Sequence, residues 1–283
     1  SNIEQIIYNL ASSLEYSGRL DKLGFKPEDV SLIRSLSSVS SGPNSAIVDN
    51  SGSWFGRAIN PNDELGVDIV LQIGSDTSHG VSDQSTTFIV QKNNKGKSQL
   101  RQIEFFDQIE QGGSPYFDIV AEETFKKQLS GLGKVRRNAY LTNYLALKAA
   151  LDGLKVDKYG NREFFDYQDM TRAVNQAMVN APGKLDNFAH FRKIHQVQGA
   201  DELKAFADGH HQDRANLTGY ISIGDVINLE PFVAIPGKFG IKEEIQIQIT
   251  KDGYEILPGS RAPPADTPGY VDALLTGPLS IPA

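Results

Sequence analysis

The sequence predicts an α+β fold, because strand-like and helical patterns occupy separate stretches of the chain. Residues 67–73, 86–91 and 224–257 have the composition and turn signals of β-strands. Residues 140–154 and 167–179 carry apolar residues at helical spacing. The chain has 283 residues, of which 39% are hydrophobic, and this is enough to bury the core of one large domain.

The N-terminal third is predicted to begin with helices and to continue as strands. Apolar residues recur at helical spacing over residues 3–14, which indicates a first amphipathic helix. A second helix is predicted to start at Pro27 and to end in the serine-rich run 35–41. Residues 97–137 fit the pattern least well, and we predict an insertion there with a helix near 121–129.

The C-terminal half is predicted to hold two long helices followed by a β-region. The stretch 140–154 has a broad apolar face, and Asp166 is the expected N-cap of the helix 167–179. Residues 224–257 read as two strands, a Pro-Gly turn, a longer strand, an Asp-Gly hairpin turn and a closing strand. The tail 258–283, rich in Pro and Gly, is expected to be extended.

Composition excludes several classes of function. The net charge is −7 and Lys and Arg are scattered, so we expect no nucleic-acid site. The chain has no cysteine, which rules out disulfides, thiolate metal sites and a cysteine nucleophile. No apolar run approaches the roughly 20 residues of a membrane span, and no signal sequence is seen. We therefore expect a cytoplasmic protein that does not bind membranes.

Two glutamates stand out in the β-region. Glu230 and Glu244 lie fourteen residues apart on strands predicted to be neighbours. This stretch resembles the C-terminal active-site signature of the M24 metallopeptidases, which include methionine aminopeptidase, aminopeptidase P and prolidase. The resemblance implies a single pita-bread domain over 1–283, with a curved, mainly antiparallel sheet backed by helices around a central pocket. It also implies that the two glutamates are metal ligands.

A second block resembles the aspartate hairpin of the same family. There two aspartates stand eleven residues apart, and the matching positions here are Gln72 and Asp83. The resemblance implies Gln72, Asp83, Glu230 and Glu244 as the metal set, although Gln72 offers only a neutral amide.

Three further residues match positions near the family's substrate. The loop 41–50 contains Asn44, and Asp49 stands where prolidase-like members have a histidine. Lys242 takes the place of the arginine in the motif Gly-Ile-Arg-x-Glu-Asp. The resemblance therefore implies Asn44, Asp49 and Lys242 as substrate-binding residues.

The histidines match the family less closely. His195 lies thirty-five residues before Glu230, and His210 follows it, so these two are the candidate catalytic histidines. The family's His-Gly-x-Gly motif is not matched before Glu230, and a solvated loop is the ordinary interpretation of His210. His190 carries no ligand spacing.

Each metal candidate also has an ordinary structural interpretation. Asp83 can be a loop aspartate, and Glu244 can be a solvent-exposed strand residue. Glu230 stands on an apolar strand, where a carboxylate is costly to bury without a partner. Lys242 is a candidate to pair with Glu230 or Asp83 where a metal ion would otherwise sit.

Three functions remain open from the sequence. The first is an M24 relative that has lost two-metal hydrolysis and binds a peptide or small molecule in its pocket. The second is a hydrolase that works with a single Mn, Zn, Co or Fe ion on Asp83, Glu230, Glu244 and His195, because three carboxylates and one histidine can hold one divalent ion. The third is a protein-interaction module that uses the pocket or residues 97–137. Whether the protein is an enzyme is left open.

Overall fold

A computed structural model describes the part of the chain that forms its sheets and long helices. The described residues are 30–32, 38–42, 45, 60–73, 80–111, 114–182, 186–193, 219–235 and 237–256. The expected helix over 3–14 and the tail 258–283 lie outside these residues.

The N-terminal sheet has five strands, and each of its pairings is antiparallel. Its two longest strands form a hairpin in which alternate residues face the two sides of the sheet. Two short strands pair along one edge of this hairpin, and one strand pairs along the other. The strands are β1 (Val30–Leu32), β2 (Ser38–Ser41), β3 (Glu64–Ile73), β4 (Gly80–Lys92) and β5 (Ser98–Gln102).

The middle of the chain supplies a small hairpin and the helices. A buried aromatic cluster includes Phe105, Phe125 and Tyr144, and the last two rings stack with centroids 4.3 Å apart. The elements are β6 (Phe106–Gln111), β7 (Ser114–Ile119), α3 (Glu122–Gln128), α4 (Lys134–Leu154) and α5 (Tyr167–Asn180). Segment 97–137 therefore contributes to the core, and its role in protein interactions stays a prediction.

The C-terminal sheet is built around one central strand. Strand β9 pairs on one side with β8 and on the other with β10 and β11, and β12 closes the edge. All of these pairings are antiparallel. The strands are β8 (Asp186–Lys193), β9 (Val226–Ile235), β10 (Phe239–Lys242), β11 (Ile245–Thr250) and β12 (Gly253–Ile256).

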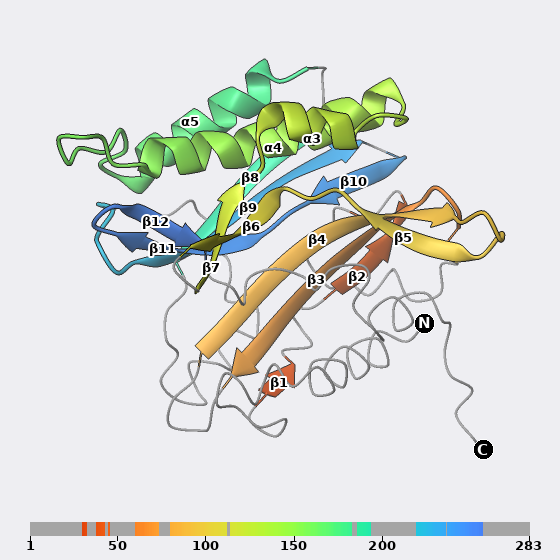
Figure 1. Ribbon diagram of the computed structural model, residues 1–283, viewed down its shortest axis with the longest axis horizontal. Helices are drawn as coiled ribbons and strands as arrows, with labels where there is room; N and C mark the ends of the chain where they lie inside the picture. The colour runs from red at the N-terminus through yellow and green to blue at the C-terminus, as the bar shows by residue number, and fades with distance from the viewer. Residues whose placement is uncertain are drawn as a thin grey trace.

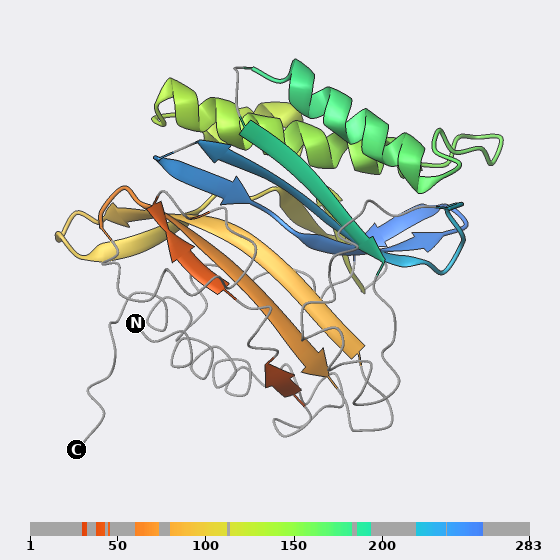
Figure 2. The same cartoon turned by 180° about the vertical axis from the view of Figure 1, so that it is seen from behind.

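The described elements form three layers. Figure 1 shows helices α3, α4 and α5 on one face of the C-terminal sheet, and the β3–β4 hairpin on the opposite side. Figure 2 shows the same order from behind. Apolar side chains from α4, α5, β9 and β11 form the main core between the helices and the C-terminal sheet. The polar residues that concern function lie instead where β10 and β11 contact β3 and β4.

The predicted α+β class is confirmed, with antiparallel sheets backed by helices. The strands divide into two five-stranded sheets and one two-stranded sheet, and all of their pairings are antiparallel. Both long helices are confirmed, and Asp166 caps α5 by accepting a hydrogen bond from the Asp169 backbone N–H.

The predicted helix from Pro27 to the serine-rich run is wrong. Strands β1 and β2 stand there, and both pair with β3. Serine is a weak helix former, and pairing with the long β3 strand satisfies the backbone hydrogen bonds of this segment. Among the described helices, none is long and apolar enough to cross a membrane.

Candidate functional site between the two sheets

Glu230 lies on β9, and Glu244 lies in the short connection between β10 and β11, at the position opposite it. Strand β10 ends with Lys242 opposite Phe232, and β11 begins with Ile245 opposite Leu229. Between these two pairs lie two residues on each side, Glu230 and Pro231 on β9 and Glu243 and Glu244 on the other segment. Continuing the same register across them sets Glu244 opposite Glu230. Directly opposite residues on antiparallel strands have Cβ atoms about 4.5–5.5 Å apart. The two carboxylates that the sequence singled out are therefore neighbours.

Both glutamates are buried. Glu230 is 2% exposed and Glu244 is 1% exposed, so the interpretation of Glu244 as a solvent-exposed strand residue is wrong. The alternation of β9 explains the position of Glu230, because Leu229 and Val233 point into the core beneath the helices. Glu230 consequently points to the other face of the sheet.

The ladder between β9 and β11 is interrupted beside these glutamates. Pro231 has no backbone N–H to donate. The backbone N–H of Glu244 instead donates to the backbone oxygen of Ser85 on β4, at 2.8 Å. This bond joins the two large sheets at the residue that carries the carboxylate.

Strand β4 makes further hydrogen bonds to the same segment. Thr86 donates its hydroxyl to Glu243 at 2.8 Å. The Thr87 hydroxyl oxygen accepts from the Lys242 backbone N–H at 2.9 Å and donates to the Lys242 backbone oxygen at 3.0 Å. All of these residues are buried, so the position of Glu244 relative to β4 is fixed by several bonds.

A buried ion pair lies in the same region. The Nζ atom of Lys242 is 2.9 Å from an oxygen of Asp68 on β3, and the two side chains are 0% and 5% exposed. Asp68 pairs in register with Ser85, next to the bond that Ser85 accepts from Glu244. The ion pair that the structure describes for Lys242 is thus with Asp68, a residue that the sequence analysis did not single out.

Asn228 holds one oxygen of Glu244. Its Nδ2 atom donates to Glu244 Oε1 at 2.6 Å, and Asn228 is fully buried. Asn228 stands two residues before Glu230 on β9, so both side chains belong to the same face of the sheet. An Asn-x-Glu pair on β9 therefore supports the glutamate between β10 and β11.

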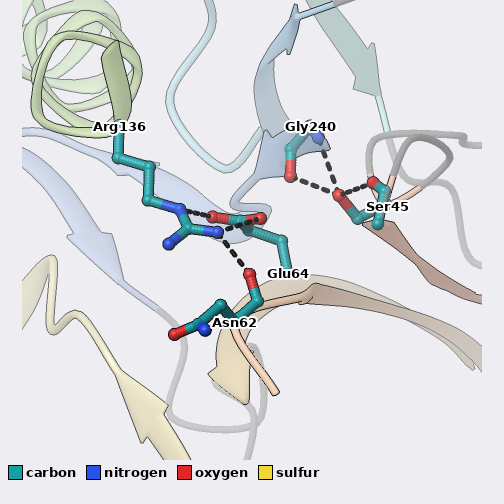
Figure 3. Close-up of polar contacts among 6 residues, drawn as sticks. Ser45, Asn62, Glu64, Arg136 and Gly240 are labelled. Atoms are coloured by element: carbon teal, nitrogen blue, oxygen red, sulfur yellow. Dashed lines mark hydrogen bonds and ion pairs between the residues drawn. The ribbon is translucent and has the colours of Figure 1, made fainter. Parts of the chain in front are cut away.

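The start of β3, at one end of the site, is bonded to helix α4 through Arg136 and Glu64 (Figure 3). Arg136 of α4 binds both carboxylate oxygens of Glu64 on β3 and donates to the backbone oxygen of Asn62. Its guanidinium also lies over the Phe239 ring of β10, 5.6 Å from the centroid. Burial raises the pKa of Glu64 above its usual value, although hydrogen bonding and charge attraction from Arg136 oppose the shift.

Ser45, from the block 41–50, contacts β10 (Figure 3). Its hydroxyl oxygen accepts from the Gly240 backbone N–H at 2.7 Å and lies 2.7 Å from the Gly240 backbone oxygen. The approach of Ser45 to β3 requires a glycine at position 66, since a Cβ atom there would stand 1.9 Å from the Ser45 backbone oxygen. Two of the family-like blocks, the one with Ser45 and the strand with Lys242, are therefore in contact.

The remaining predicted site residues are placed only in part. Gln72 lies on β3 opposite Val81, and Asp83 lies on β4 opposite Val70, so the two are diagonal neighbours rather than direct partners. Their side chains are outside what the structure describes. Four other predicted residues lie wholly outside the described residues: Asn44, Asp49, His195 and His210.

His190 was missed by the sequence analysis. Strand β8 places His190 opposite Glu230, and the connection between β10 and β11 places Glu244 on the other side of Glu230. The alternation of 186–193 could have indicated a strand, but nothing in the sequence gives its register. Among the side chains that the structure describes, no group of three or more His, Asp or Glu residues forms a metal site, and the side chains of His190 and Asp83 are not among them.

Comparisons with known proteins were made for sequence and for structure. No protein-family model and no curated protein matches the sequence. The chain is similar in structure to the Xaa-Pro dipeptidase of Bacillus anthracis, with 15% identity and a TM-score of 0.45 over 83% of this chain and 47% of that one. It is also similar to the prolidase of Pyrococcus furiosus, with 14% identity and a TM-score of 0.43 over 81% and 49% of the two chains.

A variant of Escherichia coli aminopeptidase P gives a comparable match. Its identity is 16% and its TM-score is 0.44, over 85% of this chain and 48% of that one. The chain spans about half the length of these structures.

Proposed function

We propose that this protein is a divergent M24-like protein that binds one divalent metal ion between its two large sheets. In this proposal the surrounding space holds a peptide or a small molecule, and the two-metal hydrolysis typical of the family is lost. The observation that carries the proposal is the burial of Glu230 on β9 and of Glu244 opposite it, between β10 and β11.

The chemistry of the donor set fits a single transition-metal ion. Glu230 and Glu244 offer carboxylate oxygens, and the backbone register of β8 sets His190 beside Glu230. Asp83 lies two residues before Ser85, whose backbone oxygen is bonded to Glu244. Carboxylates with one imidazole suit Mn, Zn, Co or Fe. Such an ion, when bound, polarises a carbonyl group or lowers the pKa of a water molecule.

The residues on the β3 side of the site argue against a second ion. Lys242 places a buried ammonium group 2.9 Å from Asp68, so this carboxylate already has a cation beside it. The position of the family's first aspartate is Gln72, whose amide brings no negative charge. Two divalent ions held close together need several anionic oxygens, and the β3 side of this site supplies fewer of them than the M24 motif does.

Calorimetric titration with Mn²⁺ tests the proposal. The unmodified protein should bind one ion, and Glu230→Gln and Glu244→Gln should each weaken binding at least about 10-fold, since each removes an anionic ligand. Glu255→Gln is the matched control, because Glu255 is an exposed glutamate on neighbouring strand β12 and should leave binding unchanged. Absence of binding by the unmodified protein after refolding with Mn, Zn, Co or Fe would overturn the proposal.

A single-ion hydrolase is the second candidate. The row formed by His190, Glu230 and Glu244 favours it, because one ion held by two carboxylates and an imidazole is sufficient to activate water. The two candidates are separated by incubating the metal-loaded protein with Xaa-Pro dipeptides. Binding of an ion without cleavage supports the first candidate. Cleavage that is abolished by Glu244→Gln and retained by Glu255→Gln replaces it with the second.

A further inference from the structure

Among the residues that the structure describes, the side-chain amide of Asn228 has one hydrogen-bond partner for its nitrogen atom and none for its buried oxygen atom. Its Nδ2 atom donates to Glu244 Oε1 at 2.6 Å. Its Oδ1 atom is buried and accepts no hydrogen bond from any residue that the structure describes. A buried polar atom without a partner costs about 1–3 kcal/mol, so it is retained where something else satisfies it.

The orientation of this amide follows from chemistry. An ionised carboxylate only accepts hydrogen bonds, so Asn228 must turn its N–H group toward Glu244. The amide oxygen is consequently the atom left over. Asn228 shares a strand face with Glu230 and lies directly opposite Gln246, two residues along from the position where Glu230 faces Glu244. The free oxygen therefore belongs to the same polar region as the two carboxylates.

We propose that Asn228 is a positioning residue for Glu244 and a neutral oxygen ligand for the same metal ion. The N–H group of Asn228 holds Oε1 of Glu244 and so fixes the orientation of the carboxylate. The amide oxygen of Asn228 adds a hard, uncharged ligand for the metal ion. Hydrogen-bond partners of ligating carboxylates typically change metal affinity 10–100-fold when they are removed. Oxygen donors favour Mn²⁺ over ions that prefer nitrogen ligands, so Asn228 also influences which ion is bound. This inference rests on the proposed function.

Two substitutions at position 228 separate the roles of the two amide atoms. Asn228→Leu has a similar size and removes both the donor and the acceptor. Asn228→Asp keeps an oxygen acceptor but places a second carboxylate beside Glu244. The matched control is Asn175→Asp, because Asn175 is an exposed residue of α5.

Competitive titration with Mn²⁺ and Zn²⁺ supplies the measurement. Asn228→Leu should weaken Mn²⁺ binding about 10–100-fold. It should also lower the ratio of the Mn²⁺ affinity to the Zn²⁺ affinity. Asn228→Asp should keep the ratio of the two affinities. Its Mn²⁺ affinity should fall more steeply on acidification than that of the unmodified protein, because two adjacent carboxylates retain a proton. Asn175→Asp should match the unmodified protein in both respects.

The outcomes are distinguishable from failure of the proposed function. If the unmodified protein binds Mn²⁺ and Asn228→Leu binds it with the same affinity and the same preference, the inference is overturned while the metal site stands. If Asn228→Asp binds Mn²⁺ no better than Asn228→Leu, the role of the amide oxygen as a ligand is overturned. If the unmodified protein binds no ion, the proposed function itself fails. Circular dichroism of each variant confirms that a loss of binding is not a loss of folding.

Discussion

Lys242 stands where the M24 motif that this segment resembles has an arginine. The arginine of the motif is planar and forms paired hydrogen bonds, whereas lysine is a compact point charge. Here the ammonium is fully buried and paired with Asp68 on the other sheet. A buried ion pair is weak evidence of net stabilisation, but removal of one partner leaves a buried charge behind.

Substitution of Lys242 by methionine should therefore destabilise the protein strongly. We expect a loss of about 3–5 kcal/mol in the free energy of unfolding, measured by urea denaturation, because Asp68 keeps its charge. The double variant Lys242→Met with Asp68→Leu should recover much of this loss. Lys251→Met is the matched control, since its exposed side chain should change stability by less than about 0.5 kcal/mol. Equal effects of Lys242→Met and Lys251→Met would contradict the role of the ion pair.

At the scale of elements, Arg136 connects a helix to both sheets. It extends from α4, binds Glu64 at the start of β3 and lies over Phe239 of β10. Glu64 is buried, and burial raises the pKa of its carboxyl group despite the guanidinium. The contact thus holds three elements together at one end of the site.

The pH dependence of an Arg136→Ala variant tests this contact. Removal of the guanidinium should raise the pKa of Glu64 further, because the attraction that opposes burial is lost. A carboxyl group whose folded-state pKa is raised binds a proton more tightly in the folded protein, so stability falls as pH rises through that pKa. We expect the variant to lose about 2–3 kcal/mol near pH 7 and to lose less as pH falls toward 4.5. The measurement is urea unfolding at several pH values.

The control for that experiment is Arg136→Ala combined with Glu64→Gln. With no carboxyl group left to titrate, the pH-dependent part of the loss should disappear. A loss in Arg136→Ala that stays constant or grows on acidification would contradict the account.

Local patterns in the sequence were sufficient for some elements and not for others. Asp166 and the apolar face of 140–154 are local signals, and both predicted helices are present. The segment after Pro27 forms strands because it pairs with β3, and its partners Leu71–Ile73 lie about forty residues away in the sequence. Local propensity cannot report such pairing.

The site shows the same division. Glu230 and Glu244 could be found because one hairpin-like region carries both of them. His190 could not, since motif spacing does not give the register of β8 on β9. The pair between Lys242 and Asp68 joins residues 174 positions apart, and no sequence pattern links them.

At the scale of the whole molecule, the C-terminal sheet separates two environments. One face packs apolar side chains such as Leu229 and Ile247 against the helices. The other face carries Asn228, Glu230 and Glu244 toward the β3–β4 hairpin, which Figures 1 and 2 show on the side away from the helices. Burial of carboxylates between two sheets is costly unless a cation or a hydrogen-bond donor accompanies them. The Lys242 ammonium accompanies Asp68, and in the function proposed above one metal ion binds beside the two glutamates.

The number of metal ions per chain tests this central claim most directly. Protein refolded with excess Mn²⁺ and then dialysed would be analysed by inductively coupled plasma mass spectrometry, beside Glu230→Gln, Glu244→Gln and Glu255→Gln. The account predicts one ion per chain in the unmodified protein and in Glu255→Gln, and far less than one in the other two variants. Two ions per chain, or none, would contradict it.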